Sequence, residues 1–145
     1  MLLLQSNPIA ESEWVFPVFE IIHIIGFAAA IGTIAIVDLR MLGLALRRQT
    51  AAQLLKDTSM VTLIGLAAVL TSGPILFISD PGMYMRNPSF RFKIGALGFA
   101  ILYNYTVHRY VARSESPGAF APLVAVVSLA LWLSVVAGGL FIAFV

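Results

Sequence analysis

The chain has 145 residues, of which 60% are hydrophobic and only 11% are charged, and its formal net charge is +2. A soluble domain is about 45–50% apolar and about 25% charged, so this composition, with a mean hydropathy of +0.96, indicates an integral membrane protein. The small net charge argues against a nucleic-acid partner. The absence of cysteine excludes disulfides, iron–sulfur clusters and covalently attached c-type haem.

The first predicted membrane span covers residues 14–37, an apolar run that exceeds the roughly 20 residues needed to cross a bilayer. The residues before it lack the basic start of a signal peptide and include Glu11 and Glu13, so we expect them to lie on the membrane surface. His23 lies within the run. An ionisable group at this depth is costly and normally has a partner or a function, which makes His23 the first candidate site residue.

Three further apolar runs have spanning length, at residues 61–78, 92–111 and 120–145. Because unpaired backbone polar groups are not tolerated in lipid, these runs are predicted to be helices. The connections between them are short, so neighbouring helices should run antiparallel. The predicted fold is therefore an all-α membrane protein, a single four-transmembrane-helix bundle of up-down-up-down topology over residues 1–145.

The basic residues predict the orientation of this bundle. The first and third connections together hold six lysines and arginines, whereas the second connection holds three. Basic residues favour the cytoplasmic side, so we expect both termini on the periplasmic side of a bacterial inner membrane. The six cations are Arg40, Arg47, Arg48, Lys56, Arg109 and Arg113, and the other three are Arg86, Arg91 and Lys93.

The two histidines are predicted to lie at different depths. At 1.5 Å per residue, His23 lies about 13 Å below the outer face, and His108 lies about 22 Å inward of Lys93. The two imidazoles are then about 13 Å apart along the membrane normal, whereas the axial nitrogens of one iron are about 4 Å apart. His23 is therefore the predicted ligand of a haem iron, and His108 is a second metal candidate that would need a site of its own.

A b-type haem fits a chain without cysteine, because axial ligands hold it without a covalent link. Its anionic propionates would lie toward the outer face, where Arg91 and Lys93, with Arg86, would meet them. Glu20 lies one turn before His23 and would pair with one of these cations, tune the site or relay protons. A di-iron site needs a second E-x-x-H step and further glutamates, which this chain lacks.

Each candidate also has a purely structural interpretation. His23 would be satisfied by a backbone carbonyl or a hydroxyl, and Glu20 would form a structural ion pair. His108, near the inner end of the third span, would be an interfacial residue. Asp38 and Arg40 mark the inner end of the first span, where we expect them to pair or to cap the helix.

Four segments of the chain resemble a family of small, largely uncharacterised bacterial four-helix membrane proteins: FPVFEIIHIIG, IVDLRMLGL, LTSGPILF with the following NPSFRFK, and LGFAILYN. More distantly, the chain resembles the haem-binding protoporphyrinogen oxidase HemJ family and the membrane domain of copper resistance protein D. The HemJ resemblance rests on F-x-x-x-H-x-I-G around His23 and on the apolar helix after Lys93. It implies a haem pocket at His23. Asn104 replaces a histidine of that family, so the oxidase activity is not implied, and Asn104 is kept as a candidate cofactor-binding residue.

Three functions are consistent with these residues in a protein surrounded by the lipid bilayer. The first is a b-type haem protein that carries electrons between a quinone and a partner redox protein. The second is a small transporter or copper-handling protein, in which Met83 and Met85 would be soft Cu(I) ligands. The third is a cofactor-free accessory subunit of a larger complex, and a homo-oligomer is also compatible with the sequence. A visible absorption spectrum separates the first function from the others.

Overall fold

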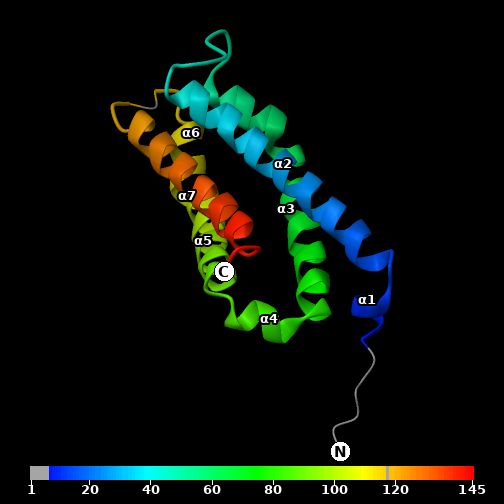
Figure 1. Cartoon of the computed structure of the whole chain (residues 1–145). Helices are drawn as coiled ribbons and strands as arrows, with labels where there is room; N and C mark the ends of the chain where they lie inside the picture. Colours follow the sequence, from blue (N-terminus) through cyan, green and yellow to red (C-terminus); the bar gives the residue numbers. More distant parts are fainter. Residues whose placement is uncertain (1–6, 117) are drawn as a thin grey trace, which may run out of the picture.

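The computed structural model describes residues 7–116 and 118–145, and the regular elements in these ranges are all helical (Figure 1). The predicted all-α class is therefore confirmed. Residues 1–6 of the predicted N-terminal surface segment lie outside the described residues. The elements are α1 Pro8–Glu11, α2 Val15–Met41, α3 Ala51–Ser79, α4 Pro81–Arg86, α5 Pro88–Tyr103, the π-helical turn η1 Asn104–His108, α6 Arg109–Arg113 and α7 Ala121–Phe141.

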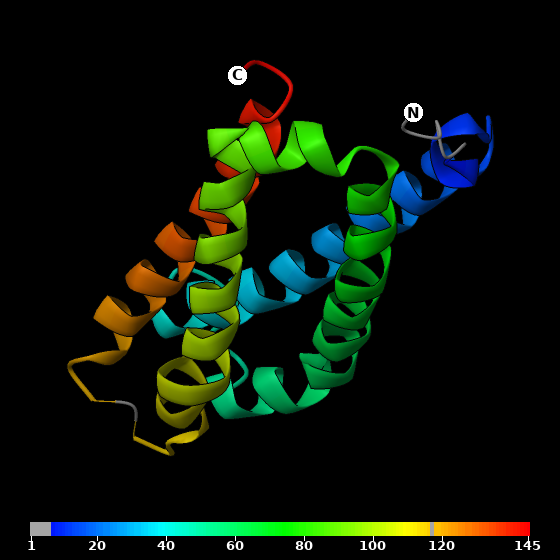
Figure 2. The ribbon, with the colours of Figure 1, turned by 90° about the horizontal axis from the view of Figure 1, so that it is seen from below.

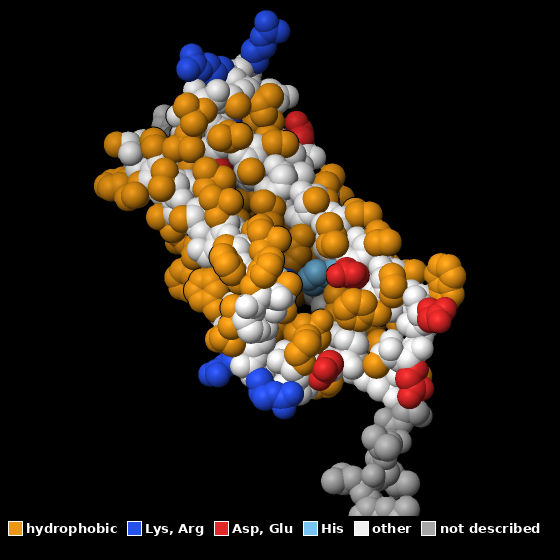
Figure 3. All heavy atoms as spheres, viewed as in Figure 1, with side chains coloured by type: hydrophobic (Ala, Val, Ile, Leu, Met, Phe, Trp, Pro, Cys, Tyr) orange, Lys and Arg blue, Asp and Glu red, His pale blue; other side chains and the backbone are white. Residues whose placement is uncertain are grey.

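Three of these helices, α2, α3 and α7, are long and apolar enough to cross a membrane. α5, η1 and α6 follow one another directly and form one helical segment from Pro88 to Arg113. Large apolar side chains such as Ile24, Leu63 and Leu133 are exposed on the long helices, and Figure 3 shows hydrophobic atoms over most of the face in view. Soluble proteins rarely expose so much apolar surface, so this exterior is suited to lipid.

α3 begins well before its apolar run because a capping box starts it. The Thr50 hydroxyl accepts a hydrogen bond from the Gln53 backbone N–H, and the Gln53 side chain accepts one from the Thr50 backbone N–H. This reciprocal pair satisfies two of the donors that a helix start leaves unpaired. Residues 51–60, which include Gln53, Lys56 and Asp57, therefore extend the helix ahead of its apolar run.

The helices form two antiparallel pairs. α2 packs along α3, and α5 packs along α7 (Figure 2). Contacts of α2 with α7 and of α3 with α6 join the pairs. α4 connects α3 to α5 at one end of the molecule, which we call the α4 end. The opposite end, where α3 contacts α6, is the α6 end.

Both ends of the described chain lie at the α4 end. Asn7 Nδ2 donates a hydrogen bond of 2.6 Å to the carbonyl of Ile78, near the end of α3. Asn87, between α4 and α5, donates through Nδ2 to the carbonyl of the C-terminal Val145 at 3.1 Å. The segments that begin and end the fold are therefore on the same side of the molecule.

The hydrophobic core occupies the middle of the molecule and its α6 end. Among the described residues, the first buried hydrophobic side chain of α2 is Ala30 and the last of α3 is Val69. The first of α5 is Leu97, and the last of α7 is Val135. In Figure 1 the two helix pairs diverge toward the α4 end. His23 and Lys93, which lie toward that end, are therefore only partly buried.

α2 and α3 approach most closely where two glycines meet. A Cβ atom at Gly65 would lie 2.7 Å from the Gly26 carbonyl oxygen and 2.9 Å from the Ala30 nitrogen. Small residues at such a crossing allow membrane helices to contact each other backbone to backbone. Gly26 lies one turn after His23, so this crossing fixes how His23 faces α3.

Candidate functional site

A hydrogen bond joins His23 to α3 and is the basis for assigning its ring proton. His23 Nδ1 lies 2.8 Å from the Ser72 hydroxyl, and that hydroxyl donates to the Ala68 carbonyl at 2.6 Å. We assign the single hydroxyl proton to the bond with Ala68, and in this tautomer His23 Nδ1 is the donor to Ser72 Oγ. His23 Nε2 then has a free lone pair, and it makes no hydrogen bond within the described residues. A neutral imidazole with one free nitrogen is the form that ligates metals.

The ring of His23 is fixed by its neighbours but is not enclosed. A Cβ atom at Gly73 would lie 3.4 Å from His23 Cε1, so glycine leaves room for the imidazole beside α3. The Phe27 ring lies edge-on to the imidazole, with centroids 5.2 Å apart and an angle of 70°. Ser72 is buried, whereas His23 is partly exposed. The ring is therefore anchored at its Nδ1 edge and accessible elsewhere.

Lys93 points into the molecule and meets the same aromatic ring. Its Nζ lies 5.0 Å from the centroid of the Phe27 ring, and a Cβ atom at Gly139 of α7 would lie 3.4 Å from Nζ. Lys93 is partly buried, and among the residues described no carboxylate forms an ion pair with it. The structure thus brings His23 and Lys93 to one aromatic side chain, from α2 and α5, and leaves the ammonium charge without an anionic partner in the described chain.

The other predicted cofactor residues at the α4 end are more peripheral. Glu20, Arg86 and Arg91 are all exposed. Over residues 7–116 and 118–145, neither arginine nor Lys93 forms an ion pair with Glu20. Glu20 lies one turn from His23 along α2, and the two arginines add positive charge to this end of the molecule.

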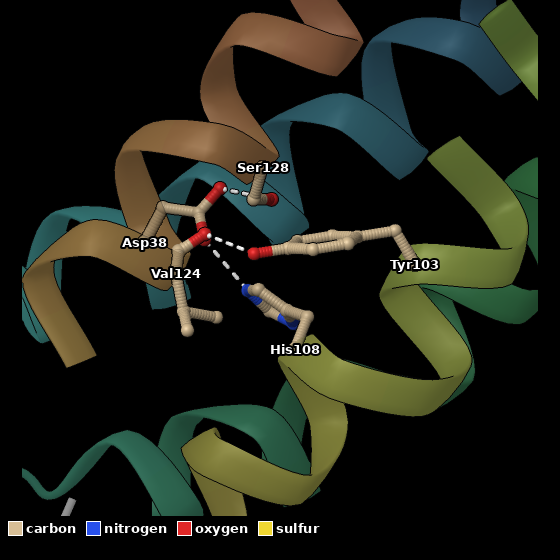
Figure 4. A network of polar contacts seen from close by, with 5 residues as sticks. All are labelled: Asp38, Tyr103, His108, Val124 and Ser128. Carbon is tan, nitrogen blue, oxygen red and sulfur yellow. Dashed lines mark hydrogen bonds and ion pairs between the residues drawn. The ribbon is translucent and has the colours of Figure 1, made fainter. Parts of the chain in front are cut away.

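A second polar cluster, the Asp38 cluster, joins the two helix pairs at the α6 end (Figure 4). It consists of Asp38 of α2, His108 of η1 and Ser128 of α7, all buried. Asp38 Oδ1 lies 2.6 Å from His108 Nε2, and Asp38 Oδ2 accepts a hydrogen bond of 2.7 Å from the Ser128 hydroxyl. Beside it, the Tyr103 hydroxyl donates to the Val124 carbonyl at 3.0 Å. A buried carboxylate in a membrane protein is costly unless it is paired, and this cluster supplies the partners.

The Asp38 cluster differs from two expectations. His108 is only 1% exposed and is not an interfacial residue. Asp38 does not pair with Arg40, because residues two apart on a helix do not face each other, and Arg40 Nε instead donates to the Gln49 carbonyl. Asp38 lies 15 residues beyond His23 on α2, about 22 Å at 1.5 Å per residue. We therefore assign the two histidines to separate sites and do not carry His108 forward as an iron ligand.

The π-helical turn η1 places Asn104 beside His108. A π turn closes with a longer hydrogen-bonded ring than an α-helix and shifts the helix face that follows it. Asn104 begins the turn and is buried, and with His108 it lines a small cavity that also contacts Thr33 and Thr62. Thr33 lies ten residues beyond His23 on α2. Asn104 therefore belongs to the surroundings of the Asp38 cluster and not to those of His23.

The residues that suggested copper binding do not converge. Met83 and Met85 are both exposed on α4, and side chains two positions apart on a helix point in different directions. In the part of the chain that the structure describes, no group of three or more histidine, aspartate or glutamate side chains could hold a metal ion. A haem iron needs only axial ligands, so this finding does not bear on His23.

Comparison with protein families matches residues 14–145 to a family of unknown function, DUF6644. The chain belongs to this family. Comparisons with curated proteins and with solved structures found no match. The match agrees with the predicted membership of an uncharacterised family, while the distant resemblance to HemJ and to copper resistance protein D stays a prediction.

Sequence reasoning missed Ser72 and Ser128, the hydroxyls that hold His23 and Asp38. Both lie inside apolar runs, and a polar side chain at such a position needs a hydrogen-bond partner. That signal could have marked the two serines as partners of buried ionisable groups. It could not have paired them, because the pairing depends on how each helix is rotated about its axis.

Proposed function

We propose that this protein binds one b-type haem at the α4 end, with His23 Nε2 as an axial ligand, and carries electrons within the membrane. The hydrogen bond from His23 to Ser72 carries the proposal, because it leaves the Nε2 lone pair free and holds the ring in one tautomer. Metal-ligating histidines almost always donate their other ring N–H to a neighbouring acceptor. When bound, the haem supplies one-electron chemistry at its iron.

The charge of Lys93 supports the same site. A partly buried ammonium is costly without an anion nearby, and Lys93 has no carboxylate partner among the described residues. A haem propionate is an anion of the right kind, and a lysine would bind it by a charge-assisted hydrogen bond. Arg91 and Arg86 would add to the favourable potential for propionates. Glu20 would tune the potential of the site or accept protons there.

The full-length protein tests this proposal through its visible spectrum. The purified protein should be red, with a b-type Soret band and about one haem per chain. His23→Ala should abolish the band, because it removes the iron ligand. His108→Gln should retain most of the band, because His108 belongs to the Asp38 cluster, and glutamine can still donate to Asp38. A colourless wild type, or equal loss from both substitutions, would reject haem binding at His23.

We further infer that α2, α3, the α5–α6 segment and α7 are four spans with up-down-up-down topology in a bacterial inner membrane. Six of the nine lysines and arginines belong to the connections at the α6 end, and three to the connection at the α4 end. The positive-inside rule then assigns the α6 end to the cytoplasm. The haem would lie toward the periplasmic side, where a quinone in the bilayer or a redox protein could exchange electrons with it.

Reporter fusions test this orientation. Because the C-terminus lies at the α4 end, alkaline phosphatase fused to it should be active, and green fluorescent protein fused to the same position should be dark. A fusion truncated in the 42–50 connection should show the opposite pattern. Fluorescence from the C-terminal fusion would assign the α6 end to the periplasm and place His23 near the cytoplasmic side.

A further inference from the structure

His108 of the Asp38 cluster and the neighbouring Asn104 each carry a buried acceptor atom that no hydrogen bond within the described residues satisfies. With the Nε2 proton of His108 directed to Asp38, His108 Nδ1 is an acceptor. Neither this atom nor Asn104 Oδ1 has a hydrogen-bond partner in the part of the chain that the structure describes. Both residues belong to η1. An unsatisfied buried polar atom costs about 1–3 kcal/mol, so two in one turn call for a ligand that donates hydrogen bonds.

The two residues line a cavity of suitable size and polarity. The cavity offers about 10 Å³ to the centre of a water molecule, close to the roughly 10–15 Å³ that one buried water requires. α3 contributes the hydroxyls of Thr58 and Thr62 to the lining, and α6 contributes Arg109. A buried water needs several polar partners, and this lining provides both acceptors and hydroxyls.

We propose that Asn104 and His108 bind one water molecule in this cavity, and that this water makes the Asp38–His108 pair a proton-loading site. The water donates to Asn104 Oδ1 and to His108 Nδ1. A proton that arrives from solvent at the α6 end binds to this water, which passes one of its own protons to the Nδ1 lone pair and so remains a neutral bound water. No electron is transferred and no other bond breaks.

The charges around the pair allow this step. Asp38, bonded to His108 Nε2, compensates the positive imidazolium, and protonated Nδ1 becomes a donor to the water. Proton relays are among the functions of histidine and carboxylate side chains buried in membrane helices. π turns within helices are frequent at functional sites. Besides Asp38 itself, the charged and titratable groups that face the pair are Tyr103 of α5, Tyr105 of η1 and Arg109 of α6. The side chains that α3 and α7 contribute are the hydroxyls of Thr58, Thr62 and Ser128.

Nitrogen NMR of the full-length protein in lipid nanodiscs tests the proposal without reference to haem. The chain has two histidines, so labelling histidine with nitrogen-15 gives two imidazoles, and His23→Gln identifies the signals of His108. At neutral pH, His108 should be protonated at Nε2 only, and Nδ1 should receive magnetisation from water. On acidification, Nδ1 should gain a proton while Nε2 stays protonated and bonded to Asp38.

Asn104→Leu provides the discriminating variant, since it keeps the volume but removes the acceptor of the water. It should abolish the water contact and lower the proton affinity of His108 by about tenfold, the size of one lost hydrogen bond to a charged group. Thr71→Val is the matched control, because Thr71 is exposed on α3 and bonds only to its own helix. It should change neither signal.

Results of three kinds would overturn the proposal. One is a wild-type His108 protonated at Nδ1 at neutral pH, which would remove the second acceptor. Another is a wild-type Nδ1 without a water contact, or one that stays unprotonated over the whole pH range in which the protein is folded. The third is an Asn104→Leu protein with unchanged proton affinity. The first two use the wild type alone, so the test holds even if Asn104→Leu does not fold.

Discussion

The two ends of this molecule differ in how their ionisable side chains are paired. At the α6 end, Asp38 is bonded through both carboxylate oxygens to side chains of two other elements, within the hydrophobic core. At the α4 end, His23 has one hydrogen bond and Lys93 has an aromatic neighbour but no ion pair among the described residues. The first end pairs its carboxylate with side chains of other elements, and the second leaves the Nε2 lone pair of His23 and the ammonium charge of Lys93 available.

This difference separates a role in stability from a role in binding. A carboxylate whose bonds reach two helix pairs stabilises their association, and its loss is costly because its partners are left unpaired. An imidazole fixed by one hydrogen bond at the edge of the core contributes little to that association. The hydrogen bond to Ser72 instead orients the His23 ring so that Nε2 stays available to a ligand. Substitutions at the two ends should therefore affect different measurements.

The largest expected effect is a loss of stability at the α6 end. Asp38→Ala should reduce the free energy of unfolding by about 2–5 kcal/mol, because it leaves the His108 Nε2–H and the Ser128 O–H without their acceptor, and each unsatisfied buried donor costs about 1–3 kcal/mol. Ser128→Ala should cost about 1.5–3 kcal/mol, since it removes one hydrogen bond to a carboxylate. Reversible unfolding in mixed detergent micelles, followed by circular dichroism, measures both changes.

Two controls make this comparison specific. Ser134→Ala, on the same helix as Ser128, removes a hydroxyl that bonds only to its own helix at Ala130, and it should change stability by less than about 0.5 kcal/mol. His23→Ala should also leave stability almost unchanged although it abolishes haem binding. If His23→Ala destabilised the protein as much as Asp38→Ala, the two ends would not differ in the way that we infer.

The second effect concerns the hydrogen bond that orients His23. Ser72→Ala removes the acceptor of the Nδ1 proton and leaves the ligand in place, so haem should still bind but about 10–100-fold more weakly, as for other partners of metal-ligating histidines. Ser72→Thr keeps a hydroxyl and should retain most of the affinity. Haem titration of the apoprotein, followed at the Soret band, measures the change. Unchanged affinity in Ser72→Ala would show that the tautomer of His23 does not matter for binding.

The helical class could be predicted from the sequence, whereas the contacts of the Asp38 cluster could not, and the reason is physical. Apolar runs in lipid must be helical, and a lone histidine in such a run is conspicuous. The Asp38–His108 contact joins residues 70 positions apart. It also depends on the π turn, which no local sequence pattern predicts. Neighbouring charges therefore suggested a pair of Asp38 with Arg40, although the helix points them apart.

The smallest effect, and the sharpest test of the α4 end, concerns Lys93. If its ammonium binds a haem propionate, Lys93→Ala removes one charge-assisted hydrogen bond but leaves the iron ligand intact. Haem affinity should fall by about tenfold, which corresponds to about 1.4 kcal/mol, and the reduction potential should shift. The form of the spectrum should not change, because the iron keeps His23. Haem titration and redox potentiometry of the variant measure these two quantities.

Matched variants distinguish this role of Lys93 from its alternatives. Lys93→Arg keeps the charge and should restore part of the affinity, although a guanidinium has a different geometry. Arg91→Ala removes an exposed cation from the same helix, and it should have a smaller effect, since Lys93 alone of the two contacts Phe27. If Lys93→Ala changed neither affinity nor potential, Lys93 would serve only to fill the space beside Phe27 and Gly139. If it altered the spectrum as strongly as His23→Ala, the ammonium would lie next to the iron itself, and the propionates would have to meet Arg91 and Arg86 instead.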